Sequence, residues 1–300
     1  MISSSQNYQA GVTIVLVATL GWSLSGVFVR LLPGLDGWQI NCWRGFWMSV
    51  GLLTYLVAVY GRDTITKFRM IPVAAMAISA GFFAIGSTLY VTSLTMVSTA
   101  TVSVIGASSA IFTGLLSPWM TGEKPGASSW IAATLAMAGV SIIAWHGVGA
   151  GNLLGIVVSI CVPISFAMQT LALRRYRGID MVPAICVGGF VTFFAAGLLG
   201  FLAGHDGGGF AVQPQQLLIL AVMGPLQLSI PLILYVRGAV SVPAVTLSLI
   251  VMLDAVLNPF WAWLLVGETP DSAAYLGGII IIGAVIVSIF GGRRMAAATS

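Results

Sequence analysis

Charged residues are scarce in this chain, because Asp, Glu, Lys and Arg together make up only 7% of its 300 residues. A soluble domain carries about a quarter charged residues, so this composition excludes an ordinary water-facing surface. Hydrophobic residues make up 58%, and the mean hydropathy is +1.04. The bilayer is therefore the expected solvent. Nucleic acid is not an expected partner, because the 12 basic residues are scattered between apolar runs instead of lying on one polar face.

Residues typical of metal sites and catalytic centres are also few. Cys42, Cys161 and Cys186 lie inside apolar runs without metal-ligand spacing, which predicts small apolar core residues. The two histidines, His146 and His205, fall between apolar runs. The chain has no HExxH, Walker or GxSxG motif and no pair of membrane-buried carboxylates. We therefore expect no enzymatic activity, no metal and no cofactor.

Long apolar runs make up most of what is present. A helix needs about 20 apolar residues to cross a bilayer. The runs lack strict alternation, and lipid offers no partners for a bare backbone, so they predict helices and not barrel strands. The predicted spans cover residues 11–31, 38–60, 71–93, 97–118, 127–146, 152–173, 181–203, 216–237, 243–266 and 271–291. The predicted fold is an all-α membrane protein of ten transmembrane helices.

The basic residues predict an orientation. If both termini face the cytoplasm, ten of the twelve lie at cytoplasmic ends of spans, and the opposite loops hold none. Arg30 and Arg44 instead lie within helices. The positive-inside rule thus predicts a multi-pass inner-membrane protein with cytoplasmic termini. The ten are Arg62, Lys67, Arg69, Lys124, Arg174, Arg175, Arg177, Arg237, Arg293 and Arg294.

The two halves of the chain match at a shift of 145 residues. The matches are Tyr90-Val91 with Tyr235-Val236, Thr101 and Ser103 with Thr246 and Ser248, Ala110 with Ala255, and GEKP at 122–125 with GETP at 267–270. At a shift of 144, CWRGF at 42–46 is similar to CVGGF at 186–190. We predict two repeats, 1–148 and 149–300, with five spans each. An odd number of spans inverts the second repeat, as in many secondary transporters with a midplane substrate site.

This pattern resembles the EamA-type carriers of the drug/metabolite transporter superfamily. The resemblance rests on five-plus-five helices, on the two Gly-Glu-x-Pro turns, and on LDAVLNP at 253–259 leading to LVGE at 265–268. The family often has Glu where this chain has Asp254, and Ser109 is the equivalent position in the first half. The resemblance implies an inner-membrane permease, commonly an exporter of amino acids or other metabolites.

Two charged residues within spans are candidate site residues. Asp254 lies mid-span, where a carboxylate costs about 2.5–3.5 kcal/mol and faces a cavity or a partner. It could bind a proton or a substrate ammonium group, or be a structural group hydrogen-bonded between helices. Arg44 lies about 10 Å below the outer end of its span. It could hold a substrate carboxylate through its planar fork, snorkel to the interface, or pair with Asp254.

Five uncharged residues complete the candidate set: Trp22, Gln169, Gln227, Tyr90 and Tyr235. Pro225 and Pro231 flank Gln227 and could expose backbone carbonyls to a cavity, although a packed kink would leave the same pattern. Trp22 could wall a substrate pocket or be a core aromatic. The repeat mates Tyr90 and Tyr235 could be gate or packing residues.

The Gly-Glu-x-Pro turns are interpreted as structural. Glycine can end one helix, proline can begin the next, and Glu suits the positive end of that next helix.

We therefore predict a secondary active transporter of small metabolites, such as amino acids or drug-like compounds, with alternating access around a cavity between the repeats. Export is implied by the resemblance alone. Protons are a candidate coupling ion, and the glycine-rich helices are compatible with a homodimer. Two other readings remain open, an intramembrane lipid-modifying enzyme and a membrane scaffold that transports nothing.

Overall fold

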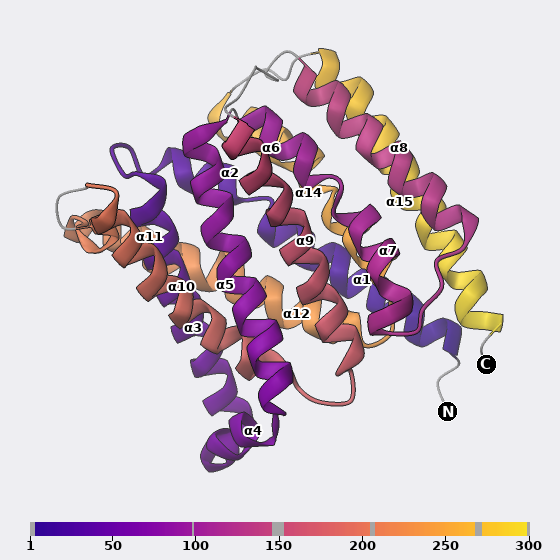
Figure 1. Ribbon diagram of the computed structural model, residues 1–300, viewed down its shortest axis with the longest axis horizontal. Helices are drawn as coiled ribbons and strands as arrows, with labels where there is room; N and C mark the ends of the chain where they lie inside the picture. Colours follow the sequence, from indigo (N-terminus) through magenta and orange to yellow (C-terminus); the bar gives the residue numbers. More distant parts are fainter. Residues whose placement is uncertain (1–3, 98, 146–152, 205–207, 268–271, 299–300) are drawn as a thin grey trace.

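Helices make up the computed structural model shown in Figure 1. It describes residues 4–97, 99–145, 153–204, 208–267 and 272–298, and among these it contains no strand. The first half contains α1 (Ser4–Trp22), α2 (Ser25–Arg30), α3 (Gly37–Tyr60), α4 (Thr64–Met70), α5 (Val73–Met96), α6 (Thr99–Gly106), α7 (Ser109–Met120) and α8 (Ala127–Ala144). The second contains α9 (Leu153–Arg175), α10 (Val182–Leu202), α11 (Pro214–Met223), a π-helical turn (Gly224–Ser229), α12 (Ile230–Ala239), α13 (Ala244–Val251), α14 (Asp254–Val266) and α15 (Ser272–Ala298).

Ten spans follow from these elements, as the hydropathy pattern predicts. Nine stretches of the described residues are helical, apolar and long enough to cross a membrane, and Tyr275–Gly291 within α15 adds a tenth apolar helix. Four spans are not single α-helices, because α1–α2, α6–α7 and α13–α14 are each interrupted and a π-helical turn joins α11 to α12. The predicted all-α membrane fold with ten helices is therefore confirmed.

Two helix breaks, one in each half of the chain, lie at equivalent positions of the repeat. α6 gives way to α7 at Ala107-Ser108, and α13 gives way to α14 at Met252-Leu253, which is the same break after a shift of 145 residues. The equivalent glycines at the ends of these spans, Gly122 (φ +76°) and Gly267 (φ +77°), both adopt the left-handed conformation. Glycine adopts this conformation without the strain that a Cβ would cause, so Gly122 ends its helix as predicted.

The helix pairs cross between the repeats. α3 packs against α10, α8 against α15, α5 against α9 and α1 against α12. At the α3–α10 crossing the equivalent residues Gly45 and Gly189 meet, and a Cβ on Gly45 would lie 2.9 Å from the Gly189 carbonyl oxygen. Such small residues let helix backbones approach closely in lipid. The cysteines serve the same contact, since Cys42 and Cys186 are buried and each thiol donates to a carbonyl of the opposite helix.

The predicted basic side lies at one end of the bundle. α4, the α7–α8 turn and the α9–α10 turn lie toward the lower side of Figure 1, where α1 begins and α15 ends. We call this the basic end, because Lys67, Arg69 and Lys124 are in these segments and Arg62 lies in the 3-10 turn Gly61–Asp63 just before α4. The predicted boundary between repeats at 148/149, together with His146 and His205, lies outside the described residues.

Candidate functional site

A cavity of about 230 Å³ lies between the two repeats. Its walls come from α1, α3, α5 and α9, and from the π-helical turn and α12. Five of the seven candidate residues line it, namely Trp22, Arg44, Tyr90, Gln169 and Tyr235. The other lining residues are Phe82, Phe83, Gly86, Ser87, Val162, Phe166, Leu228 and Leu232.

The cavity follows the pseudo-symmetry of the repeats. The shifts of 144 and 145 residues relate lining residues to lining residues, as the pairs Trp22/Phe166, Phe83/Leu228, Ser87/Leu232 and Tyr90/Tyr235 show. Arg44 breaks the pattern, because its mate is Gly188, which does not line the cavity. The aromatic wall is therefore duplicated, whereas the positive charge is contributed by the first repeat alone.

Arg44 is the charged group of the cavity wall. Its Nη2 donates to Asn41 Oδ1 over 3.3 Å, and Ser87 Oγ donates to the same oxygen over 2.6 Å. Among the described residues no carboxylate pairs with Arg44, and its Nε and the Nδ2 of Asn41 are buried donors without an acceptor. Unmet buried donors are costly, more so when charged, so this corner of the cavity is suited to accept an anion.

Aromatic rings form another part of the cavity wall. The Trp22 and Tyr235 ring centroids are 5.0 Å apart, and Phe166 lies 6.3 Å from Tyr235. The Tyr235 hydroxyl is 2.9 Å from Thr170 Oγ1, and this hydrogen bond holds the phenol in place. Tyr90 remains 40% exposed and lies within electrostatic range of both Arg44 and Asp254. The arrangement gives a pocket whose wall combines aromatic rings with one guanidinium group.

Gln227 lies outside the cavity wall although it is buried. It belongs to the π-helical turn, which contains Pro225, so the flanking prolines coincide with a local distortion. Its Nε2 donates to the Trp22 carbonyl oxygen over 3.3 Å, at the end of α1 where the helix is interrupted. Gln227 thus bonds a carbonyl freed by the break beside the cavity.

Asp254 is likewise not among the lining residues. It is the first residue of α14, where the helix dipole favours a carboxylate, and its Oδ1 accepts from Asn258 Nδ2 over 3.1 Å. The structure therefore separates it from Arg44, and the two form no ion pair. Asp254 begins the helix that follows the α13–α14 break, and its carboxylate interacts electrostatically with the cavity residue Tyr90, as Arg44 does.

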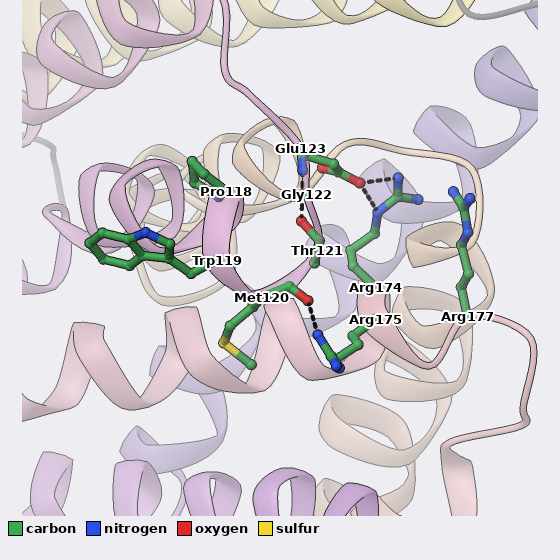
Figure 2. Close-up of a pocket in the computed structure, with 9 residues that line it drawn as sticks. All are labelled: Pro118, Trp119, Met120, Thr121, Gly122, Glu123, Arg174, Arg175 and Arg177. Carbon is green, nitrogen blue, oxygen red and sulfur yellow. Dashed lines mark hydrogen bonds and ion pairs between the residues drawn. The ribbon is translucent and has the colours of Figure 1, made fainter.

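A second hollow, of about 480 Å³, lies at the basic end around the α7–α8 turn (Figure 2). Glu123 forms an ion pair with Arg174 there, and Arg174 Nη1 also donates to the carbonyls of Ala239 and Val240, over 2.8 Å each. Glu123 Oε2 accepts from the Ala244 backbone N–H over 3.1 Å. Glu123 does bind a helix N-terminus, but that of α13 in the other repeat and not that of the next helix. Its mate Glu268 lies outside the described residues.

Sequence reasoning missed several residues of the central site. Asn41, Ser87 and Phe166 were not candidates, yet each lines the cavity or bonds to Arg44. A usable signal is helical spacing, because Ser87 precedes Tyr90 by three residues and Phe166 precedes Gln169 by three. Asn41 precedes Arg44 by the same interval, so a search one turn away from each candidate finds all three.

Comparisons with known proteins agree with this geometry. The family model described as the EamA-like transporter family matches residues 9–145 and again 150–290. The chain is similar to a Bacillus subtilis (strain 168) protein named "Uncharacterized transporter YdfC", with 26% identity over 272 residues, 87% of this chain and 85% of that protein. A solved crystal structure shares the fold with a TM-score of 0.82 at 15% identity, covering 96% of this chain and 99% of that one. With both halves matched, the chain belongs to the EamA-like transporter family and is a multi-pass membrane transporter.

Proposed function

We propose that this transporter is a secondary active carrier of a small carboxylate-bearing metabolite, with amino acids as the leading class. The observation that carries the proposal is the half-buried Arg44 side chain, which lines the central cavity with a buried Nε and without a carboxylate partner among the described residues. A charge at this depth costs about 2.5–3.5 kcal/mol, which a bound anion would offset. Arginine suits a carboxylate because its planar fork can donate two parallel hydrogen bonds.

The size of the cavity narrows the substrate class. Pockets for drug-sized ligands measure about 300–1,000 Å³, whereas this cavity measures about 230 Å³. The aromatic rings of Trp22, Phe166 and Tyr235 would contact an apolar side chain or backbone while Arg44 binds the carboxylate. These two properties favour a small amphipathic acid over a large drug-like cation.

Alternating access fits the placement of this cavity between inverted repeats. Rocking of one five-helix bundle against the other would expose the site to each side in turn. The interrupted helices α1–α2, α6–α7 and α13–α14 and the π-helical turn give positions at which the bundles could bend. We further propose an inner-membrane location with cytoplasmic termini, from the positive-inside rule, and export as the direction, from the family resemblance.

Counterflow in sealed proteoliposomes tests the carrier. Vesicles loaded with an unlabelled solute are diluted into the labelled one, across a panel of amino acids, their decarboxylated amines, nucleosides and amphipathic cations. We expect saturable exchange of at least one amino acid and none of its decarboxylated amine, because the amine lacks the partner for Arg44. Exchange of amines or cations in place of acids would overturn the proposed substrate class.

A turnover assay separates transport from the other readings. Folded protein that exchanges nothing across this panel, but converts a lipid in detergent without vesicles, would identify a lipid-modifying enzyme. Protein that does neither would support a scaffold role. Saturable exchange that a competing unlabelled acid suppresses would establish the carrier.

We also propose that Asp254 couples transport to protons. Its carboxylate interacts electrostatically with the cavity residue Tyr90. It also lies at the α13–α14 break, where a change of its charge could move a helix. Asp254→Asn should abolish uptake driven by a pH gradient while leaving counterflow intact, because counterflow needs no net proton movement. Asp36→Asn, in the α2–α3 connection, is the control. Undiminished pH-driven transport by Asp254→Asn would rule the coupling role out.

A further inference from the structure

The hollow at the basic end shares no lining residue with the central cavity. Its lining consists of Pro118, Trp119, Met120, Thr121, Gly122, Glu123, Arg174, Arg175 and Arg177. Three guanidinium groups and one carboxylate give the hollow a net charge of +2. Glu123 is already neutralised by Arg174 and by the Ala244 N–H, so it leaves the charges of Arg175 and Arg177 uncompensated.

The two remaining arginines are exposed and positioned to bind. Arg175 Nη1 donates to the Met120 carbonyl oxygen over 2.7 Å, which fixes the guanidinium at the wall and leaves its other donors available. No hydrogen bond or ion pair reaches the Arg177 guanidinium within the part of the chain that the structure describes (Figure 2). A phosphodiester oxygen is an acceptor that an exposed guanidinium group recognises.

Exposed apolar side chains lie in and beside the wall of the hollow. Trp119 in its wall is 80% exposed, and Leu115, one turn earlier on α7, is 51% exposed. Tryptophan is enriched at the level of lipid headgroups, where its ring contacts acyl chains and its N–H faces water. A headgroup phosphate in the hollow would thus have its acyl chains beside Trp119 and Leu115.

The repeat provides an internal comparison. Glu123 and Arg174 have sequence mates in Glu268 and Arg30, so this pair of residue types recurs with the fold. Arg175 and Arg177 instead correspond to Leu31 and Pro33, and Trp119 corresponds to Leu264. The extra arginines and the tryptophan are therefore not required by the five-helix architecture.

From these observations we infer that the hollow around the α7–α8 turn binds the phosphodiester headgroup of an acidic phospholipid through Arg175 and Arg177, with Trp119 against the acyl chains. Basic hollows between membrane helices recognise lipid phosphates in this way. The lipid would bridge the α7–α8 turn of the first repeat and the α9–α10 turn of the second, and so act on the contact between repeats at this end.

Native mass spectrometry of the detergent-purified full chain tests the site with dioleoylphosphatidylglycerol as the probe. Arg175→Gln combined with Arg177→Gln should weaken binding roughly thirtyfold, at about 1 kcal/mol for each lost charge. The matched control is Arg62→Gln with Arg69→Gln, which removes the same charge from exposed positions of the same end. Equal weakening by both double variants, or binding of the first within twofold of the parent, would overturn the inference.

Two further arms identify the ligand. Dioleoylphosphatidylcholine should bind far more weakly than the acidic lipid, and inorganic phosphate at millimolar concentration should not displace it. Displacement by phosphate would assign the hollow to a soluble anion instead. Brominated phosphatidylglycerol should quench a tryptophan signal that Trp119→Phe removes, and quenching unchanged by that substitution would place the lipid elsewhere. If the double variant unfolds, Arg177→Gln alone serves, since the Arg177 side chain makes no hydrogen bond or ion pair with the described residues.

Discussion

The two repeats line the cavity with equivalent positions but differ in the polar residues at those positions. Trp22 and Phe166 are mates, as are Tyr90 and Tyr235, and all four line the cavity. At the polar positions the repeats diverge, because Arg44 corresponds to Gly188 and Ser87 corresponds to Leu232. The first repeat therefore supplies the charge and its hydrogen-bond support, whereas the second supplies aromatic and aliphatic surface together with Gln169. The duplicated fold has kept its packing, but among the described residues only the first copy places a charged side chain in the cavity wall.

Packing explains why the charge is not duplicated. A Cβ on Gly188 would lie 3.1 Å from the Ala80 carbonyl oxygen and 3.2 Å from the Phe83 Cβ, so a longer side chain would have to displace α5. A second guanidinium in a cavity of about 230 Å³ would also add another desolvated charge of the same sign. The close α5–α10 contact thus favours glycine where the first repeat has arginine.

Removing the Arg44 charge should have the largest effect on exchange of the carboxylate substrate. Arg44→Gln leaves a polar side chain but no cation, and truncating one member of a buried charge pair costs 2–5 kcal/mol. Exchange of the carboxylate substrate should fall about a hundredfold in kcat/KM, with Arg44→Lys intermediate because it keeps the charge without the fork. Initial counterflow rates over a range of substrate concentrations measure this.

Arg62→Gln provides the control, since it removes an exposed arginine at the basic end. If Arg44→Gln exchanged the acid as fast as the parent, the asymmetry between the repeats would have no role in substrate binding. A loss of exchange accompanied by a lower melting temperature in detergent than that of Arg62→Gln would point to misfolding and not to lost recognition.

A smaller effect, on stability, is expected at the Glu123–Arg174 ion pair between the repeats. Glu123→Gln leaves Arg174 with carbonyl partners but no counter-charge, and Arg174 is only 7% exposed in its side chain. Breaking a fully buried pair costs 3–5 kcal/mol, and because Glu123 is 28% exposed we expect about 2 kcal/mol of lost stability. Thermal unfolding in detergent measures it against Lys124→Gln at the exposed neighbouring position. Equal melting temperatures for the two variants would contradict a stabilising role.

The spans and the repeat could be predicted because each depends on sequence alone. Hydropathy and length define a span wherever lipid is the solvent, and the shift of 145 residues pairs Tyr90 with Tyr235 before any packing is known. Pro225 and Pro231 likewise predict a distortion, which the structure realises as the π-helical turn. Each of these features could be predicted because it depends on the residues of one segment and not on contacts between segments.

Contacts between distant segments could not be predicted in the same way. Glu123 bonds to α9 and to the start of α13, segments more than fifty residues away, and no pattern near Glu123 indicates them. The cavity wall similarly depends on which face each helix turns inward, and the apolar composition of these spans gives little contrast between faces. Gln227 was a candidate because of its depth, yet its amide bonds Trp22 because α1 is interrupted there.

The smallest predicted effect compares Ser87 with its mate Leu232. Ser87 Oγ holds the Asn41 amide through a hydrogen bond of 2.6 Å, and that amide in turn accepts from Arg44. Ser87→Ala removes one hydrogen bond, about 1 kcal/mol, and should raise KM for the carboxylate substrate roughly fivefold with little change in kcat.

Leu232→Ala enlarges the cavity on the apolar side and should weaken large substrates more than small ones. It should leave the preference for the acid over its amide analogue unchanged, whereas Ser87→Ala should reduce that preference. Counterflow with both solutes gives the two ratios directly. If Leu232→Ala reduced the preference as much as Ser87→Ala did, recognition of the carboxylate would be a property of the whole cavity and not of the corner that the first repeat supplies.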